Sequence, residues 1–520
     1  MSPAANPPEE SQDVLQEAVF AFLSDPATHQ GVPVRRIDTH AAVVFLAGEH
    51  AYKVKKAVRF PFLDFSTLSR RKDACDAEIE ANRPFAPDLY RGVVAITRDT
   101  DGTLAIAGQG RPIEWAVEMR RFDETQTLDR LADTTGIDIT LADALARDIA
   151  AAHAKAPVVD AADWIGVLAS SIAQNDAAFR AHVAVFPGPQ VERFTRACDA
   201  ALARIRPLLM ARGHDGLVRR GHGDLHLGNI ALIDGRPVPF DALEFDPVIA
   251  SGDVLYDLAF LLMDLVERGL PSRANVVLNR YLAQTRRAQD LDALAALPLF
   301  LSVRAGIRAQ VTAARLSHAS ESERPAIAKT ARAYFDLATV SIAPPAPRLI
   351  AIGGLSGTGK SALARSLAPG LAPAPGAVVL RSDVERKALF GVAETDRLGP
   401  DAYHADVTAR VYSALAEKAH RVISAGHSAI VDAVFAQPRE RAAVNAIASE
   451  TGVQYRGLFL TASLATRVAR VDTRKGDASD ADRSVARTQD AFALGDMDWT
   501  EIDASGTPED TLARAQKMLA

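Results

Sequence analysis

Two short stretches of this 520-residue sequence combine residue types that suit chemistry on phosphate groups. The first is HGDLHLGN, residues 222–229, in which Asn229 follows Asp224 within one short segment. In the pattern H-x-D-L-x-x-x-N, the aspartate orients the proton of an incoming hydroxyl group, and the asparagine reaches the metal ion bound to the phosphates. Four specified positions make a chance match rare, so we predict a first site around Asp224.

The second stretch is GLSGTGKS, residues 354–361, which matches G-x-x-x-x-G-K-[ST] directly after a strand-like run. In this pattern the glycines let the backbone curl until its N–H groups face the phosphates of a nucleotide. Lys360 is expected to reach the terminal phosphates, and Ser361 to coordinate Mg²⁺. The predicted nucleotide-binding residues of this second site are Gly354, Ser356, Gly357, Thr358, Gly359, Lys360, Ser361 and Ala362.

Polar residues farther along the chain would complete the second site. Arg381, Ser382 and Asp383 follow the next strand-like run, and we predict that Asp383 is a general base. Asp432 ends another strand-like run and is predicted to support Mg²⁺ through water. A later helix-like run carries arginines that we predict to close over the transferred phosphoryl group, namely Arg467, Arg470 and Arg474.

The elements that must position these residues follow two different patterns. Up to about residue 122 the sequence reads as short strands with one helix, and from 128 to 340 it is mostly helical around one strand-rich patch. From residue 348, strands alternate with helices, which implies a parallel, doubly wound sheet. The prolines of SIAPPAPR, residues 341–348, separate the two patterns because proline stiffens the chain and cannot continue a helix.

We therefore predict a chain with α+β and α/β domains. The expected parts are a disordered tail over 1–12, a two-lobed domain over 13–340 with lobes at about 13–122 and 123–340, a proline-rich linker over 341–347, and a P-loop domain over 348–520.

Residues 222–264 resemble the aminoglycoside phosphotransferase family of small-molecule kinases, including the run VLYDLAFLLMDL that follows the motif. This resemblance implies a protein-kinase-like fold for the front of the chain. It implies that Asp224 is the catalytic base and that Asn229 and Asp241 are ligands of Mg²⁺. It also implies that Asp257 has a structural role in holding the catalytic loop, and that His222 serves packing and hydrogen bonding.

The nucleotide partners in the N-terminal lobe lie near the run AYKVKKAV. Lys53 is the expected phosphate-binding lysine, but Lys55 points to the same face of a strand, so the choice between them stays open. Glu78 is the expected ion-pair partner of this lysine, and Glu80 is the alternative.

The adenine is expected to meet a hinge strand at 113–122, through the backbone from Glu118 to Arg120. The turn before Lys53 contains the single glycine Gly48, and no G-x-G-x-x-G precedes the lysine. We therefore expect this turn to cover the phosphates more loosely than the loop of a protein kinase does.

Residues 348–520 resemble the small P-loop kinases related to gluconate kinase and to the 5′-kinase domain of polynucleotide kinase. The joined order of the two parts resembles bacterial bifunctional aminoglycoside phosphotransferase/ATP-binding proteins. The resemblance implies ATP and Mg²⁺ as cofactors and hydroxyl groups of small molecules as acceptors. Two alternatives remain: the P-loop domain senses nucleotide and gates the first site, or it phosphorylates polynucleotide 5′ ends.

The bulk composition narrows the class of protein. Apolar residues make up 48% and charged residues 24%, as in soluble globular proteins, and the net charge of −6 argues against a constitutive nucleic-acid binder. Two cysteines, Cys75 and Cys198, argue against a disulfide framework, and the first residues lack a signal-peptide pattern. The longest apolar run, 254–266, contains two aspartates and predicts a buried helix. We therefore expect a cytoplasmic protein without a membrane segment.

Overall fold

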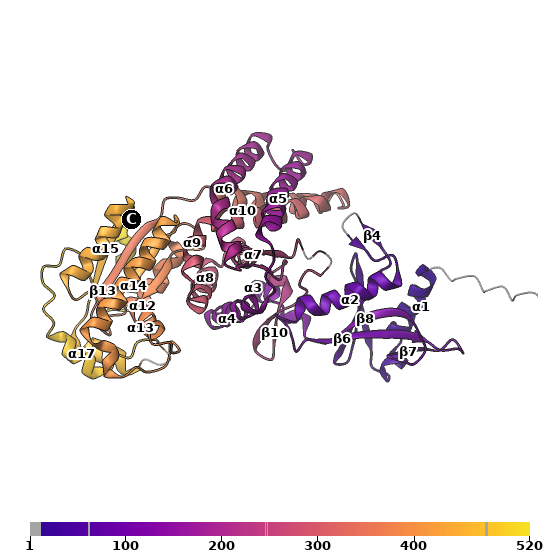
Figure 1. Ribbon diagram of the computed structural model, residues 1–520, viewed down its shortest axis with the longest axis horizontal. Helices are drawn as coiled ribbons and strands as arrows, with labels where there is room; N and C mark the ends of the chain where they lie inside the picture. Colours follow the sequence, from indigo (N-terminus) through magenta and orange to yellow (C-terminus); the bar gives the residue numbers. More distant parts are fainter. Residues whose placement is uncertain (1–11, 61–62, 245, 247, 474–476, 520) are drawn as a thin grey trace, which may run out of the picture. The chain divides into compact units, whose positions relative to one another are not determined.

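The computed structural model describes residues 12–60, 63–244, 246, 248–473 and 477–519 (Figure 1). Of the predicted disordered tail, residues 1–11 lie outside the described residues, and helix α1 begins at Gln12. By the density of contacts the chain divides into two compact units: one holds residues up to 137, 148–167 and 213–257, and the other holds 138–147, 168–212 and 258–520. The helices after residue 258 thus group with the P-loop segment, and the domain division at 341–347 remains a prediction.

The first unit is built on an antiparallel sheet with the strand order β1-β2-β3-β8-β6-β7. Alternate residues face opposite sides of each strand, so one face packs against helix α1 through Phe20 and Leu23, and the other packs against helix α2 through Cys75. These elements are α1 (Gln12–Ser24), β1 (Val34–Asp38), β2 (Ala42–Ala47), β3 (His50–Lys55), α2 (Leu68–Asn82), β6 (Tyr90–Arg98), β7 (Leu104–Ile106) and β8 (Arg111–Arg120).

Two short strand pairs frame the loops that carry the predicted acids of the first site. Strand β9 pairs with β12, and β10 pairs with β11, so residues 221–229 leave one pair and enter the other. The smaller elements of this unit are β4 (Arg59–Phe60), β5 (Leu63–Asp64), α3 (Leu128–Asp133), β9 (Val218–Arg220), β10 (Ile230–Ile233), β11 (Arg236–Pro239) and β12 (Ser251–Asp253).

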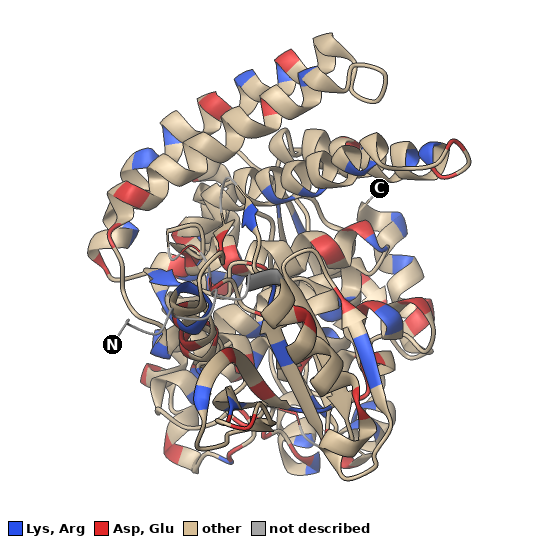
Figure 2. Cartoon of the chain, turned by 90° about the vertical axis from the view of Figure 1, so that its right-hand side faces the viewer, with Lys and Arg blue, Asp and Glu red and all other residues tan. Residues whose placement is uncertain are grey.

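Long helices make up most of the chain between residues 139 and 342. Helix α7 is buried from Val254 to Leu265, which confirms the predicted buried helix. No helix among the described residues is long and apolar enough to cross a membrane. Figure 2 shows basic and acidic residues interspersed along the helices that face the viewer. The helices are α4 (Ile139–Lys155), α5 (Ala161–Ala181), α6 (Gly188–His214), α7 (Val254–Glu267), α8 (Pro271–Thr285), α9 (Ala288–Asp292), α10 (Leu297–Ala314) and α11 (Arg324–Ile342).

The P-loop segment forms a parallel sheet with the strand order β14-β15-β13-β16-β17, which confirms the predicted fold class. Figure 1 shows helices α12, α14 and α15 beside its central strand, and Leu363 of α12 and Ala515 of α18 pack into the same core as Ile350 and Ile352. The strands are β13 (Arg348–Gly354), β14 (Val378–Arg381), β15 (Ala429–Asp432), β16 (Gln454–Thr461) and β17 (Thr500–Asp503). The helices are α12 (Lys360–Leu367), α13 (Ser382–Leu389), α14 (Ala405–Ser424), α15 (Pro438–Thr451), α16 (Leu464–Thr473), α17 (Arg483–Asp490) and α18 (Pro508–Leu519).

Helix α8 covers the open edge of this sheet. The amide oxygen of Asn279 accepts a hydrogen bond from the Val379 N–H at 2.7 Å, and its amide nitrogen donates to the Ala377 carbonyl at 3.1 Å. The Asn275 amide donates to the same carbonyl at 3.0 Å. Edge strands leave backbone groups unpaired, so these two side chains take the place of a neighbouring strand beside β14.

A buried histidine beneath the same edge makes the stability of this domain depend on pH. His427 donates from Nε2 to the Gly376 carbonyl at 2.9 Å, and burial lowers its pKa from 6.5 to about 4. Because the unfolded state takes up the proton first, stability is complete above pH 6.5 and falls as the pH drops toward 4, by about 3 kcal/mol in total. We expect His427→Gln to remove this loss from the pH dependence of the melting temperature. His214→Gln, at a side chain that is 92% exposed, is the control and should retain it.

Candidate functional site

The predicted catalytic loop, residues 222–229, is held by a buried carboxylate at the start of α7. Asp257 accepts the backbone N–H of His222 at 2.8 Å on one oxygen and that of Gly223 at 2.9 Å on the other. The ring of His153 lies 3.1 Å from the same carboxylate. These bonds give Asp257 the loop-holding role that the family resemblance implied.

His222 is a structural residue of this loop. Its ring is fully buried, and its Nε2 donates to the Phe240 carbonyl at 3.0 Å. Burial lowers the pKa of the ring despite the nearby carboxylates, so the ring is neutral at pH 7. The bond to Phe240 joins this loop to the segment that leads into Asp241.

Asp224 and Asn229 face each other across this loop. The Asn229 side-chain amide donates to the Asp224 carboxylate at 2.9 Å and to the Asp224 carbonyl at 3.1 Å. The Asp224 side chain is 35% exposed, so a hydroxyl group arriving from solvent has access to its carboxylate. The amide therefore orients a carboxylate that a substrate can approach.

Asp241, Lys53 and Glu78 form a second cluster in the same unit. The Lys53 ammonium lies 2.6 Å from an Asp241 oxygen and 2.9 Å from a Glu78 oxygen. Burial acts to raise the pKa of Asp241, but the ammonium groups of Lys53 and Lys55 outweigh it and hold this pKa below its usual range. Asp241 is therefore an anion, and a carboxylate together with the Asn229 amide oxygen makes a donor set that suits Mg²⁺.

The structure distinguishes the alternatives for the ion pair. Lys53 and Lys55 both point to the α2 face of the sheet and both reach Glu78, whereas Glu80 is exposed. Of the two lysines, Lys53 is the one that pairs with Asp241. Lys55 instead pairs with Glu244, a residue that no motif marks.

Two expectations about the N-terminal lobe need correction. Glu118 lies opposite Tyr52 of β3 and opposite Gly92 of β6, so its backbone is inside the sheet, and its carboxylate contacts His50 at 2.7 Å. The connector that leaves the sheet begins after Arg120, later than the predicted hinge backbone.

The Gly48 turn, which was expected to cover the phosphates, lies at the other end of strand β3. Its neighbour Glu49 accepts the Arg121 N–H at 2.9 Å, which puts the turn at the hinge end of strand β3. The loop between β1 and β2, at Thr39, lies instead beside the Lys55 end of that strand, where Lys56 N–H bonds to the Ala41 carbonyl. Antiparallel pairing determines this difference, because successive turns of a meander lie at opposite ends of the sheet.

In the second site, the backbone of residues 354–361 needs glycine at two points. A Cβ atom on Gly354 would lie 2.7 Å from the Leu460 carbonyl oxygen, and one on Gly357 would lie 2.5 Å from the Arg467 carbonyl oxygen. Both residues also have positive φ angles, 139° and 88°. Close packing against neighbouring backbone therefore explains these glycines.

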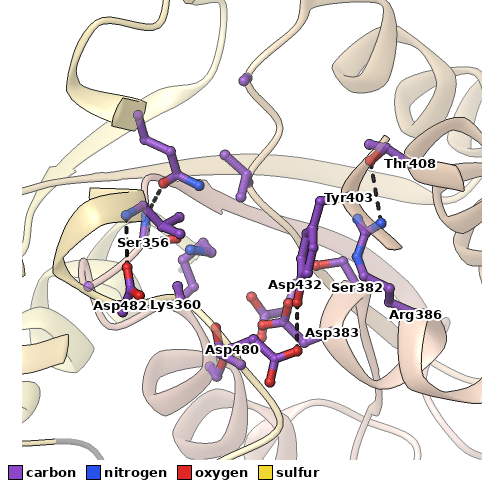
Figure 3. A pocket seen from close by; sticks show the side chains of 18 of the residues that line it. Ser356, Lys360, Ser382, Asp383, Arg386, Tyr403, Thr408, Asp432, Asp480 and Asp482 are labelled. Atoms are coloured by element: carbon purple, nitrogen blue, oxygen red, sulfur yellow. Dashed lines mark hydrogen bonds between the residues drawn. The ribbon is translucent and has the colours of Figure 1, made fainter. Parts of the chain in front are cut away.

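This loop borders a cavity of about 950 Å³ (Figure 3). The cavity is lined by Ser356, Gly357, Gly359, Lys360, Ser361 and Ala362, together with Asp383 and Asp432. Thr358 is buried and donates to the Leu355 carbonyl at 2.8 Å, so it shapes the loop from within, as does Gly354. The Lys360 ammonium donates to the same carbonyl at 3.3 Å.

Ser361 and Asp432 lie together at the carboxyl end of the sheet. The Ser361 hydroxyl donates to the Asp432 carboxylate at 2.5 Å. A hydroxyl and a carboxylate oxygen this close form a donor set that fits Mg²⁺. The Arg381 guanidinium supplies the local positive charge, 3.1 Å from the Ser361 oxygen and 3.4 Å from Asp432, and it also contacts Asp477 at 2.7 Å.

Asp383 lies across the cavity from Lys360 (Figure 3). Burial raises the pKa of its carboxyl group, although Arg381 and Lys360 act in the opposite direction. A raised pKa brings a carboxylate closer to the range in which general bases work.

The site also contains residues that the sequence analysis missed: the Tyr403 hydroxyl donates to Asp480 at 2.7 Å, and the Arg386 guanidinium lies 4.8 Å from the centre of the Tyr403 ring.

The three predicted lid arginines occupy different environments. Arg470 lines the cavity. Arg467 does not, because its guanidinium is buried between α16 and α17, where it pairs with Asp490 and donates to the Ala486 carbonyl at 3.1 Å. The prediction for Arg467 is therefore corrected to a structural role. Arg474 lies outside the described residues.

Comparisons with known proteins find a family model and solved structures that match parts of the chain. The family model AAA_33, described as an AAA domain, matches residues 349–493. Solved structures similar to parts of the chain include a choline/ethanolamine kinase family protein from Mesorhizobium loti, with 12% identity, 63% of this chain and 99% of that chain covered, and a TM-score of 0.33. A gluconokinase from Sinorhizobium meliloti 1021 matches with 18% identity, 33% of this chain and 95% of that chain covered, and a TM-score of 0.24.

Two curated relatives extend over nearly the whole chain. "Uncharacterized protein Rv2004c" of Mycobacterium tuberculosis H37Rv is 31% identical over 490 residues, which cover 92% of this chain and 94% of the relative. "Uncharacterized protein Mb2027c" of Mycobacterium bovis matches with the same identity and coverage. The chain therefore belongs to the family that includes these mycobacterial relatives.

Proposed function

We propose that this protein is an ATP-dependent phosphotransferase with two nucleotide sites, each of which transfers the γ-phosphoryl group of ATP to a hydroxyl group of a small molecule. The observation that carries the proposal is the presence, in one chain, of two separate sets of phosphate-chemistry residues. Asp224, Asn229 and Asp241 form the first set, and Lys360, Ser361 and Asp383 form the second.

At the first site, the Asp224 carboxylate would accept or orient the proton of the acceptor hydroxyl. The Asn229 amide holds this carboxylate in place, at 2.9 Å. Lys53 would contact the phosphates, and Asn229 and Asp241 would hold Mg²⁺, which when bound neutralises charge on the phosphates. Catalysis would therefore depend on positioning and electrostatic stabilisation.

At the second site, the backbone N–H groups of residues 354–361 would surround the phosphates. Lys360 and Arg470 would stabilise the charge on the transferred group, and Asp383 would accept the proton of the acceptor hydroxyl. Ser361 and Asp432 would hold Mg²⁺. The cavity of about 950 Å³ extends to Tyr403 and Asp480 and so has room for an acceptor beside the nucleotide.

A second candidate function is that the P-loop domain senses nucleotide and gates the first activity. The bonds from Asn279 and Asn275 to strand β14 favour it, because this strand leads directly into Arg381 and Asp383. A change at the P-loop site would therefore reach helix α8 through a rigid strand.

The test is a screen of metabolites for an ATP-dependent mass gain of one phosphate, made with the full chain and repeated with two variants. If both sites catalyse, Asp224→Asn and Lys360→Ala each abolish phosphorylation of a different acceptor. If the P-loop domain is a sensor, Lys360→Ala removes no product and changes only the rate or affinity of the first reaction. Absence of any phosphorylated product with the unaltered chain contradicts the proposed function.

A further inference from the structure

The first site contains a second buried lysine that the proposed reaction does not use. Around Glu78, each carboxylate oxygen is paired with a different ammonium group: Lys53 lies 2.9 Å from one oxygen, and Lys55 lies 2.5 Å from the other. Each lysine then continues to the loop that follows β11, where Lys53 reaches Asp241 and Lys55 reaches Glu244. Two parallel ion-pair chains thus connect β3, α2 and the segment from Asp241 to Glu244.

The two lysines differ in their access to a ligand. The Lys53 side chain is 15% exposed, whereas the Lys55 side chain is 2% exposed. The Lys55 ammonium lies 5.5 Å from the centre of the Phe65 ring, which covers it. Lys53 can therefore turn toward a nucleotide, and Lys55 cannot do so without leaving a buried position between carboxylates.

The proposed reaction requires an ion pair of Lys53 to open, but it requires no change in the ion pairs of Lys55. For Asp241 to hold Mg²⁺ and for Lys53 to contact the phosphates, their direct pair at 2.6 Å must open. Among the described residues, the ion pairs that then still join β3 and α2 to this segment are those of Lys55, with Glu78 and with Glu244. The Asn82 amide oxygen of α2 accepts the Ala242 N–H at 2.9 Å and holds the backbone of this segment, so the Lys55 pairs would hold the Glu78 side chain relative to the segment when the nucleotide binds.

We propose that Lys55 is a positioning residue of the first nucleotide site, which keeps Glu78 and the Asp241–Glu244 segment joined while Lys53 and Asp241 engage the nucleotide. The inference rests on the proposed function of this site. It assigns to Lys55 and Glu244 a role that acts through Glu78 and Asp241 and not through direct contact with the substrate.

The experiment measures binding of Mg·ATP to the full chain in a Lys360→Ala background, so that the titration reports the first site. Lys55→Met and Glu244→Gln are each expected to weaken binding by about tenfold or more, as is usual for groups that orient ligands of a metal. Because the two residues act through one ion pair, the double variant is expected to bind no more weakly than Lys55→Met alone.

The matched control is Lys72→Met, which likewise removes one positive charge, here from helix α2. Lys72 pairs with Asp76 at 2.5 Å, outside the Glu78 cluster, and its loss is expected to leave Mg·ATP affinity within about twofold. Melting curves of every variant establish that the first unit is folded. Should Lys55→Met fail to fold, Glu244→Gln alone decides the question.

Three outcomes have distinct meanings. Weakened binding in the single variants with a non-additive double variant supports the inference. Binding within about twofold of the parent in Lys55→Met or Glu244→Gln, or losses that multiply in the double variant, overturns it. No saturable Mg·ATP binding in the Lys360→Ala parent itself overturns the proposed function of the first site, and the inference with it.

Discussion

Replacing Lys360 with alanine is expected to lower phosphoryl transfer at the P-loop site by about 10³-fold or more in kcat/KM. The lysine is the one cation that the P-loop pattern itself directs at the terminal phosphates, and its ammonium lies 3.3 Å from the Leu355 carbonyl, within the loop that would surround them. Alanine removes that charge without altering Gly354 or Gly357, whose tight packing fixes the loop. The measurement is the steady-state rate for the acceptor that the metabolite screen assigns to this site.

The control for this variant is Lys517→Ala, at an exposed lysine in the last turn of α18 in the same domain. It is expected to retain the rate of the unaltered chain. A Lys360→Ala variant that keeps more than about a tenth of the rate would show that the loop does not hold the transferred phosphoryl group, and the P-loop site would then be assigned to sensing.

Local patterns explain why much of the second site could be predicted from sequence. The run at residues 354–361 specifies its own backbone conformation, and the strand that precedes it is apolar and β-branched, so neither depends on distant residues. The same holds for Asp383 and Asp432, because the carboxyl ends of parallel strands meet at one edge of a sheet. The structure places both residues in the cavity beside Lys360.

Residues whose environment is set by distant segments could not be predicted in this way. Arg467 and Arg470 are three positions apart on α16, yet one is buried against α17 and the other lines the cavity. Helix α17 decides between them, and its short sequence, RSVARTQD, does not reveal that it packs against α16. Arg386, Tyr403 and Asp480 belong to the cavity for the same reason, since loops far apart in sequence bring them together.

In the first site, too, the sequence of one strand does not determine which distant residues its side chains contact. Alternation predicts that Lys53 and Lys55 share a face, which the structure confirms, but it cannot say which of them meets Asp241. That contact depends on a loop about 190 residues away, as does the pair of Lys55 with Glu244. The structure places the predicted hinge residue Glu118 inside the sheet, because β8 continues to Arg120 as a strand and Glu118 has strand partners on both sides.

Replacing Asp224 with asparagine is expected to lower kcat at the first site by about 10²- to 10⁴-fold, the range found for loss of a general acid or base. Asparagine keeps the size of the side chain and an oxygen that can accept the hydrogen bond from the Asn229 amide, so the loop is expected to stay in place. Only the capacity to take a proton is lost. Half-saturation by ATP is expected to change little, because Lys53, Glu78 and Asp241 are unaltered.

A matched variant separates this effect from a general loss of negative charge. Asp234 lies in the turn between β10 and β11 of the same unit, is 68% exposed and pairs with Arg120, and its positive φ of 51° is one that asparagine tolerates. Asp234→Asn is therefore expected to keep the full rate. Both variants should retain the P-loop reaction, which Lys360→Ala removes. If Asp224→Asn instead lowers the apparent affinity for ATP and spares kcat, Asp224 acts in nucleotide binding, and the proton must be accepted by another group near the 221–229 loop.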